Sequence, residues 1–194
     1  MLLSFAGCTY RPYQYSFLLI DPYVEDLKFE DKDVSFQFVP TSEHIWVSIY
    51  NKTENSIYFD ADKAEYIGPS GESNNILFGW RYSFEMWNYI SNNRYINPIR
   101  VGPKSISEGN IWINIWPGPG GDFGDGWTSV TGQEIDYLDH GMLPEYSYEG
   151  DGKVLKDSTF FLILPIQFDS YLKNYEFIFM IKNVEIENES VPEG

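Results

Sequence analysis

Apolar and polar residues alternate along much of the chain with a period of two. In residues 34–38, for example, the polar Ser35 and Gln37 alternate with the apolar Val34, Phe36 and Phe38. Further runs of this alternating or apolar kind are residues 17–20, 45–50, 111–116, 159–168 and 175–186. Because successive side chains of a strand point to opposite faces, the pattern predicts β-strands at these places.

Turn signals separate the apolar runs at short intervals. Polar residues 51–55 join two such runs as a hairpin loop would, and Pro69 with Gly71 marks another turn. Seven to nine short strands with turns roughly every 8–12 residues are typical of an antiparallel sandwich. The sequence therefore predicts an all-β fold, an antiparallel β-sandwich of the immunoglobulin-like type. The Cys…Trp…Cys signature of antibody domains is absent from the chain.

The stretch GWRYSFEMWNYI, residues 79–90, departs from the period of two. Trp80, Phe84 and Trp87 recur at helical spacing, which favours a short helix packed across one end of the sheets. A pair of strands is the alternative interpretation of the same residues.

The 194 residues suit one domain. We expect a partial signal and tether at 1–16, a single sandwich domain at 17–187 and a polar tail at 188–194. Within the domain, residues 118–157 carry nine of the 16 glycines and nine of the 29 acidic residues, with little apolar periodicity. Such a long Gly/Asp-rich segment predicts an insertion, and its aromatic residues indicate that it is partly ordered.

The charge of the chain excludes some partners. The formal net charge is -16, and this field would repel a phosphate backbone, so we expect no nucleic-acid partner. The single cysteine, Cys8, has no partner for an intrachain disulfide, and no Cys/His cluster offers a zinc site. A chemical role for Cys8 must therefore come from the residues around it.

Cys8 follows a short apolar run that ends in Phe5-Ala6-Gly7. In this run the chain resembles bacterial membrane lipoproteins, whose lipobox ends in two small residues and a cysteine. The resemblance covers Ser4 to Cys8, with Phe5 where leucine is usual, and it implies a diacylglyceryl group on the thiol. Acylated Cys8 would anchor the domain in a membrane of the bacterial cell envelope, facing the periplasm or the cell surface.

Only seven residues precede Cys8, and they lack a basic segment. We expect Met1 to be an internal methionine of a longer gene product. The alternative is a frayed apolar N-terminus with an incidental buried cysteine.

Residues 110–117 place two tryptophans on one face of a predicted strand. Trp112 and Trp116, with Asn114 between them, would stand about 13 Å apart at strand rise, as a platform for sugar rings. Trp127 is a third candidate for this ligand-binding role. The alternative is that Trp112 and Trp116 pack against the second sheet or under the insertion.

The insertion holds the candidates for metal binding and catalysis. Asp122 and Asp125 lie in a Gly-rich loop that could surround Ca²⁺, but the spacing of the EF-hand loop is absent, and a solvated acidic turn is the alternative. His140, beside Asp139, is expected to be a loop residue rather than a catalytic base. His44 begins a strand and is expected to be structural.

Together these observations predict a lipid-anchored envelope protein that acts as a binding or accessory module without catalysis or a cofactor. Its partners would be the membrane, through Cys8, and envelope proteins or glycans. A carbohydrate-binding domain that uses exposed tryptophans is the alternative. An envelope hydrolase built on the acidic insertion, with a pair of carboxylates, is the third hypothesis.

Overall fold

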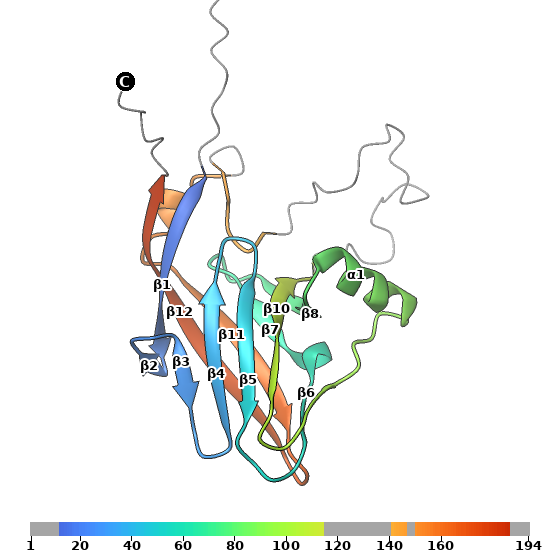
Figure 1. Cartoon of the computed structure of the whole chain (residues 1–194). Helices are drawn as coiled ribbons and strands as arrows, with labels where there is room; N and C mark the ends of the chain where they lie inside the picture. The colour runs from blue at the N-terminus through green and yellow to red at the C-terminus, as the bar shows by residue number, and fades with distance from the viewer. Residues whose placement is uncertain (1–11, 115–140, 147–149, 187–194) are drawn as a thin grey trace, which may run out of the picture.

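A computed structural model of the chain describes residues 12–114, 141–146 and 150–186. Within these residues, twelve strands form one sheet in which every pairing is antiparallel (Figure 1). The strands are β1 (Tyr13–Asp21), β2 (Tyr23–Val24), β3 (Lys28–Glu30), β4 (Val34–Pro40), β5 (Ile45–Asn51), β6 (Ile57–Phe59), β7 (Glu65–Ile67), β8 (Ser73–Gly79), β9 (Ile99–Val101), β10 (Ile106–Ile113), β11 (Thr159–Gln167) and β12 (Leu172–Ile186). The helices are η1 (Ala61–Lys63), α1 (Tyr82–Ser91) and η2 (Gly152–Leu155).

The sheet order is β2-β1-β12-β11-β7-β8-β10-β5-β4-β3, and β6 pairs with β11 and β9. Strand β8 joins two halves of this sheet. Its residues Ser73–Asn75 pair with β7, and its residues Ile76–Gly79 pair with β10. We call the half that contains β1, β12, β11 and β7 the terminal half, and the half that contains β10, β5, β4 and β3 the central half.

The two halves meet through aromatic side chains that β4 and β12 direct into the core. Phe38 of β4 packs edge-on against Phe177 and Phe179 of β12, with ring centroids 4.7 and 5.3 Å apart. Phe36 meets Tyr175 with ring centroids 5.0 Å apart and the two rings tilted at 56°. All five rings are buried, and the alternation predicted for residues 34–38 is confirmed. The all-β antiparallel fold is thus confirmed, while the immunoglobulin-like sandwich stays a prediction.

The first strand begins earlier than the sequence predicts. Strand β1 starts at Tyr13, so the expected tether boundary at residue 16 is wrong. Tyr13 is held because its backbone N–H donates to Glu145 O at 2.8 Å, and the Tyr15 hydroxyl donates to Pro144 O at 2.6 Å. These partners come from a segment distant in sequence, which the period of two does not reveal.

The described parts of the predicted insertion pack on the domain. Met142 and Leu143 are buried in the core, and both backbone N–H groups donate to Ser42 O, at 2.7 and 2.9 Å. Helix η2 follows, and Ser158 O accepts from the backbone N–H of Ile181 in β12 at 2.9 Å. The end of the 118–157 segment therefore belongs to the folded domain.

Asp31, in the turn between β3 and β4, ties the central half to β12. Its Oδ2 accepts from Lys173 Nζ at 2.6 Å and from the Tyr175 hydroxyl at 2.9 Å, and its Oδ1 accepts from the backbone N–H groups of Asp33 and Val34 at 2.8 Å. Burial alone would raise the pKa of this carboxyl. The hydrogen bonds from Lys173, the two backbone N–H groups and Tyr175 outweigh burial and lower the pKa to about 2.

We expect Asp31→Asn to lower the free energy of unfolding at pH 7 by about 1–2 kcal/mol, after allowance for solvent screening of this partly exposed group. A carboxyl whose pKa is lowered on folding stabilises the protein above its unfolded pKa. The contribution of Asp31 is therefore lost as the pH falls from the ordinary value of 3.8 to about 2. Urea unfolding at a series of pH values measures both effects.

Glu25→Gln, at an exposed carboxylate, is the matched control and should leave the free energy of unfolding unchanged. Equal stability of Asp31→Asn and the parent protein at pH 7 would contradict the role given to Asp31.

Candidate binding site beside helix α1

Helix α1 packs on the central half of the sheet through one narrow stripe. Met86 is buried against Leu77 of β8 and Trp112 of β10, and Tyr82 and Tyr89 pack at the edges of this cluster. These helix positions are separated by three and four residues, the spacing that brings side chains to one face. The predicted helix is confirmed, and the alternative of a strand pair is wrong.

The residues that led to the helix prediction do not form its buried stripe. Trp80, just before the helix, and Phe84 and Trp87 within it keep 62, 59 and 55% of their surface exposed. Met86, rather than one of these three residues, makes the contact with Leu77. We call Trp80, Phe84 and Trp87 the aromatic face of α1.

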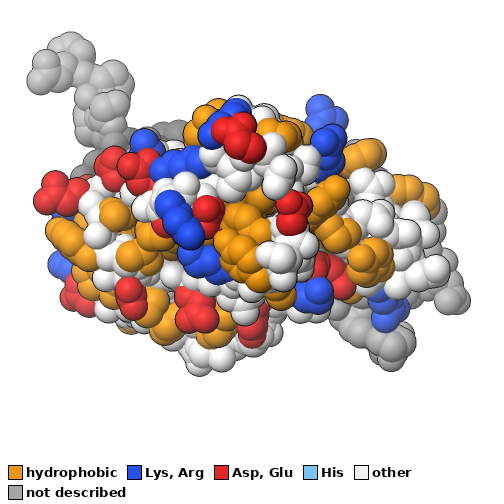
Figure 2. Space-filling model, turned by 90° about the horizontal axis from the view of Figure 1, so that it is seen from below, with side chains coloured by type: hydrophobic (Ala, Val, Ile, Leu, Met, Phe, Trp, Pro, Cys, Tyr) orange, Lys and Arg blue, Asp and Glu red, His pale blue; other side chains and the backbone are white. Residues whose placement is uncertain are grey.

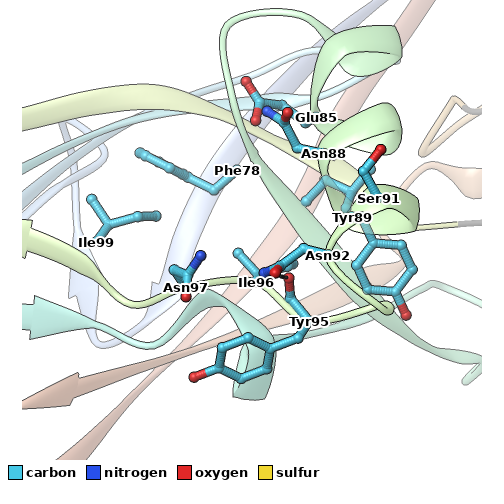
Figure 3. A pocket seen from close by; sticks show the side chains of 11 residues that line it. Phe78, Glu85, Asn88, Tyr89, Ser91, Asn92, Tyr95, Ile96, Asn97 and Ile99 are labelled. Carbon is cyan, nitrogen blue, oxygen red and sulfur yellow. Dashed lines mark hydrogen bonds between the residues drawn. The ribbon is translucent and has the colours of Figure 1, made fainter.

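A pocket of about 410 Å³ opens beside the helix, and its described lining does not include Trp80, Phe84 or Trp87. Figure 3 shows Glu85 and Asn88 together on α1, with Asn92 and Tyr95 in the turn that follows and Asn97 beyond them. The lining residues are Leu77, Phe78, Glu85, Asn88, Tyr89, Ser91, Asn92, Tyr95, Ile96, Asn97 and Ile99. Helix α1, strand β8, the 92–97 turn and the start of β9 thus enclose one site.

Hydrogen bonds at both ends of the turn after α1 hold this part of the pocket lining in place. Asn93 and Arg94 adopt left-handed backbone conformations, with φ of 53° and 63°, and so reverse the chain directly after the helix. The Asn92 side-chain amide donates to Tyr95 O at 2.8 Å. The backbone N–H of Ile96 donates to Asp62 Oδ1, in η1, at 3.2 Å.

The pocket is polar but carries little charge. Three amide side chains, Asn88, Asn92 and Asn97, line it together with hydroxyl groups, and among the described lining residues only Glu85 is charged. Burial raises the pKa of the Glu85 carboxyl, although the Asn88 side chain and the backbone of Trp80 hydrogen-bond to it. The site therefore combines amide donors and acceptors with one half-buried carboxyl group.

Phe78 forms part of the apolar floor and is held from two sides. Its ring packs edge-on against Phe59 of β6, with centroids 5.3 Å apart. Gly109 of β10 lies against the same ring, so closely that a Cβ at this position would lie 2.8 Å from Phe78 Cζ. Because Gly109 has no side chain, the Phe78 ring can occupy this space.

Trp112, at the end of β10, does not form the exposed tryptophan platform considered from the sequence. Trp112 is only 8% exposed, its Nε1 donates to Gly79 O at 3.4 Å, and its ring lies 4.5 Å from that of His44. The alternative of ordinary packing holds for this residue, because Met86 and His44 cover its indole. Asn114 follows the end of β10, and its backbone N–H donates to Asn75 O at 2.8 Å.

Most of the other predicted site residues lie outside the described residues. These are Cys8, Trp116, Asp122, Asp125, Trp127 and His140. Acylation of Cys8 and Ca²⁺ binding at Asp122 and Asp125 therefore stay predictions. Among the residues that the structure does describe, no group of three or more His, Cys, Asp or Glu could hold a metal ion.

His44 packs as a structural residue. Its ring lies on Trp112, and its Nδ1 is 3.8 Å from Glu43 Oε2. Within the described part of the chain, no group hydrogen-bonds to Nδ1. Burial lowers the pKa of His44 against the opposing effect of Glu43.

Comparisons of the chain with protein-family models, with curated proteins and with solved structures find no match. None of the helices among the described residues is long and apolar enough to span a membrane.

We expect Gly109→Ala to destabilise the protein by about 1–3 kcal/mol, because the added methyl group forces the Phe78 ring from its position. Thermal unfolding of the variant measures the loss. Ser48→Ala, on the neighbouring strand β5, is the control and should unfold near the parent temperature. An unchanged unfolding temperature for Gly109→Ala would show that Phe78 is not fixed by this contact.

Proposed function

We propose that the chain is a non-catalytic binding module of the bacterial cell envelope, anchored through acylated Cys8 and built on an immunoglobulin-like sandwich. Its ligand site is the pocket beside α1. The observation that carries the proposal is the convergence of three asparagine amides on a pocket with an apolar floor. Clefts with an apolar surface and a few convergent polar groups are where small ligands bind.

The lining favours an uncharged ligand that bears many hydroxyl groups, such as a sugar unit of a glycan. Each asparagine amide both donates and accepts hydrogen bonds, which matches a hydroxyl group. Tyr89 and Tyr95 offer rings against which the C–H face of a sugar packs. The part of the lining that the structure describes has no lysine or arginine to neutralise an anion, and the net charge of -16 adds to the repulsion of anionic ligands.

The same lining argues for binding rather than hydrolysis. Glycoside hydrolysis uses two carboxyl groups on opposite sides of the scissile bond. Among the described residues that line the pocket, Glu85 is the single carboxyl group, and the Asn88 side chain hydrogen-bonds to it. The envelope-hydrolase hypothesis would need a second carboxyl group facing Glu85.

We expect the protein to bind neutral envelope glycans on an array, and Asn88→Ala and Asn97→Ala each to weaken binding about tenfold, the effect of one or two lost hydrogen bonds. Titration calorimetry with the glycan that the array selects measures the loss. Asn174→Ala, at an exposed amide of β12, is the matched control and should bind as the parent does. Undiminished affinity in both pocket variants would rule out this site.

The anchor has a separate test. When the gene is expressed from its native start in its own host, Cys8→Ser should move the protein from the membrane fraction to the soluble fraction. Mass spectrometry of the parent should find acyl chains on the peptide that contains Cys8. Ser83→Ala, on the exposed side of α1, should leave the distribution unchanged. An unmodified Cys8 in the native membrane fraction would refute the anchor while leaving the ligand site untouched.

A further inference from the structure

The end of the domain that follows Cys8 in the chain is marked by contacts of β1. The backbone N–H of Tyr13 donates to Glu145 O at 2.8 Å, and the neighbouring Leu143 N–H donates to Ser42 O at 2.9 Å in the β4–β5 turn. The start of β1, residues 142–146 and the β4–β5 turn therefore lie together. We call this region the tether end.

Helix α1 begins at the same end. His44, at the end of the β4–β5 turn, lies 4.5 Å from Trp112 between ring centroids. Trp112 in turn lies 6.0 Å from Tyr82, the first residue of α1. Figure 1 shows the start of β1 and the end of β12 at the top of the molecule, with α1 in its upper half.

The chain between Cys8 and Tyr13 is short. Four residues lie between the two positions, and the five residue-to-residue steps span at most about 18 Å when fully extended. If Cys8 is acylated, as the proposed function holds, the tether end lies within this distance of the membrane surface. The start of α1 then lies at the end of the domain that faces the bilayer.

From this juxtaposition we propose that the aromatic face of α1 docks on the surface of the bilayer that holds acylated Cys8. Trp80, Phe84 and Trp87 keep more than half of their surface exposed, and tryptophan is enriched at the membrane–water interface. This inference rests on the proposed anchor.

Charge indicates which kind of lipid fits. The net charge of -16 opposes binding to anionic headgroups, so apolar contact with a zwitterionic interface supplies the attraction. One acyl group and one apolar helix face act as two linked contacts, and the second is intramolecular once the first is made.

The ligand site lies next to the docked face, toward another side of the helix. Glu85, Asn88 and Asn92 follow a stripe roughly a quarter turn around α1 from the aromatic face, at 3.6 residues per turn. The opposite end of the domain then points away from the lipid. Figure 2, which views the molecule from that end, shows lysine and arginine side chains interspersed with acidic and apolar ones.

A nitroxide on residue 84 tests the docking. In the acylated protein the Cys8 thiol is consumed, so Phe84→Cys introduces one reactive thiol while Trp80 and Trp87 remain. The labelled, acylated protein is placed in phosphatidylcholine vesicles. We expect its collision rate with a water-soluble nickel chelate to fall severalfold and its collision rate with oxygen to rise, as for a site at the lipid interface.

Ile106→Cys is the matched control. Ile106 is 58% exposed, similar to Phe84, and starts β10 beside the 102–105 turn, at the far end of the strand from Trp112. A label there should collide with the nickel chelate as it does without vesicles.

Equal accessibility of residue 84 with and without vesicles, in protein shown by mass to be acylated and membrane-bound, would overturn the docking and leave the anchor standing. Dipolar broadening between labels would show that a second copy covers the face, which also overturns it. Absence of acylation would instead refute the proposed anchor.

Discussion

The whole domain depends on the side-chain contact between β4 and β12. The two strands are not neighbours in the strand order, and they meet through their buried rings. Edge-on packing of Phe38 against Phe177 gives the contact a defined geometry as well as a large buried apolar area. Asp31 adds a polar link at the margin of the same contact, through Lys173 and Tyr175.

Strand β8 connects this core to the candidate site. It pairs with the terminal half through its first residues and with the central half through its last, so it connects the two halves of the sheet. Leu77 and Phe78 lie in its last part, one under Met86 and the other in the pocket floor. The pocket is therefore positioned by β8, the strand that also joins the two halves of the sheet.

Much of the fold can be predicted from local patterns, because a strand with one buried face has apolar residues at every second position. This is why the alternation in β4 and β5 is sufficient to predict both strands. The strand boundary at Tyr13 was beyond such reasoning, since its partner Glu145 lies more than 130 residues away. Local periodicity contains no information about partners at that distance.

The candidate site was less predictable, for a related reason. Three aromatic residues at helical spacing indicate a helix correctly, but spacing does not say which stripe is buried. Contacts between Met86 and Trp112 decide this, and they bury the tryptophan that alternation alone would place on an exposed face. Once a helix is predicted here, Glu85, Asn88 and Asn92 stand three and four residues apart, which indicates a polar stripe on one face. This signal could have been found from the sequence.

The pairing of β1 with β12 has a mechanical consequence. The ladder runs from Tyr13 opposite Ile186 to Asp21 opposite Ile178, so almost all of β1 is bonded to the last strand of the domain. A pull on the chain before Tyr13, directed along β1, loads these hydrogen bonds in shear, and they share the force. A pull directed across β1 would instead open these bonds one at a time. The first strand is thus built to bear tension applied from its N-terminal side.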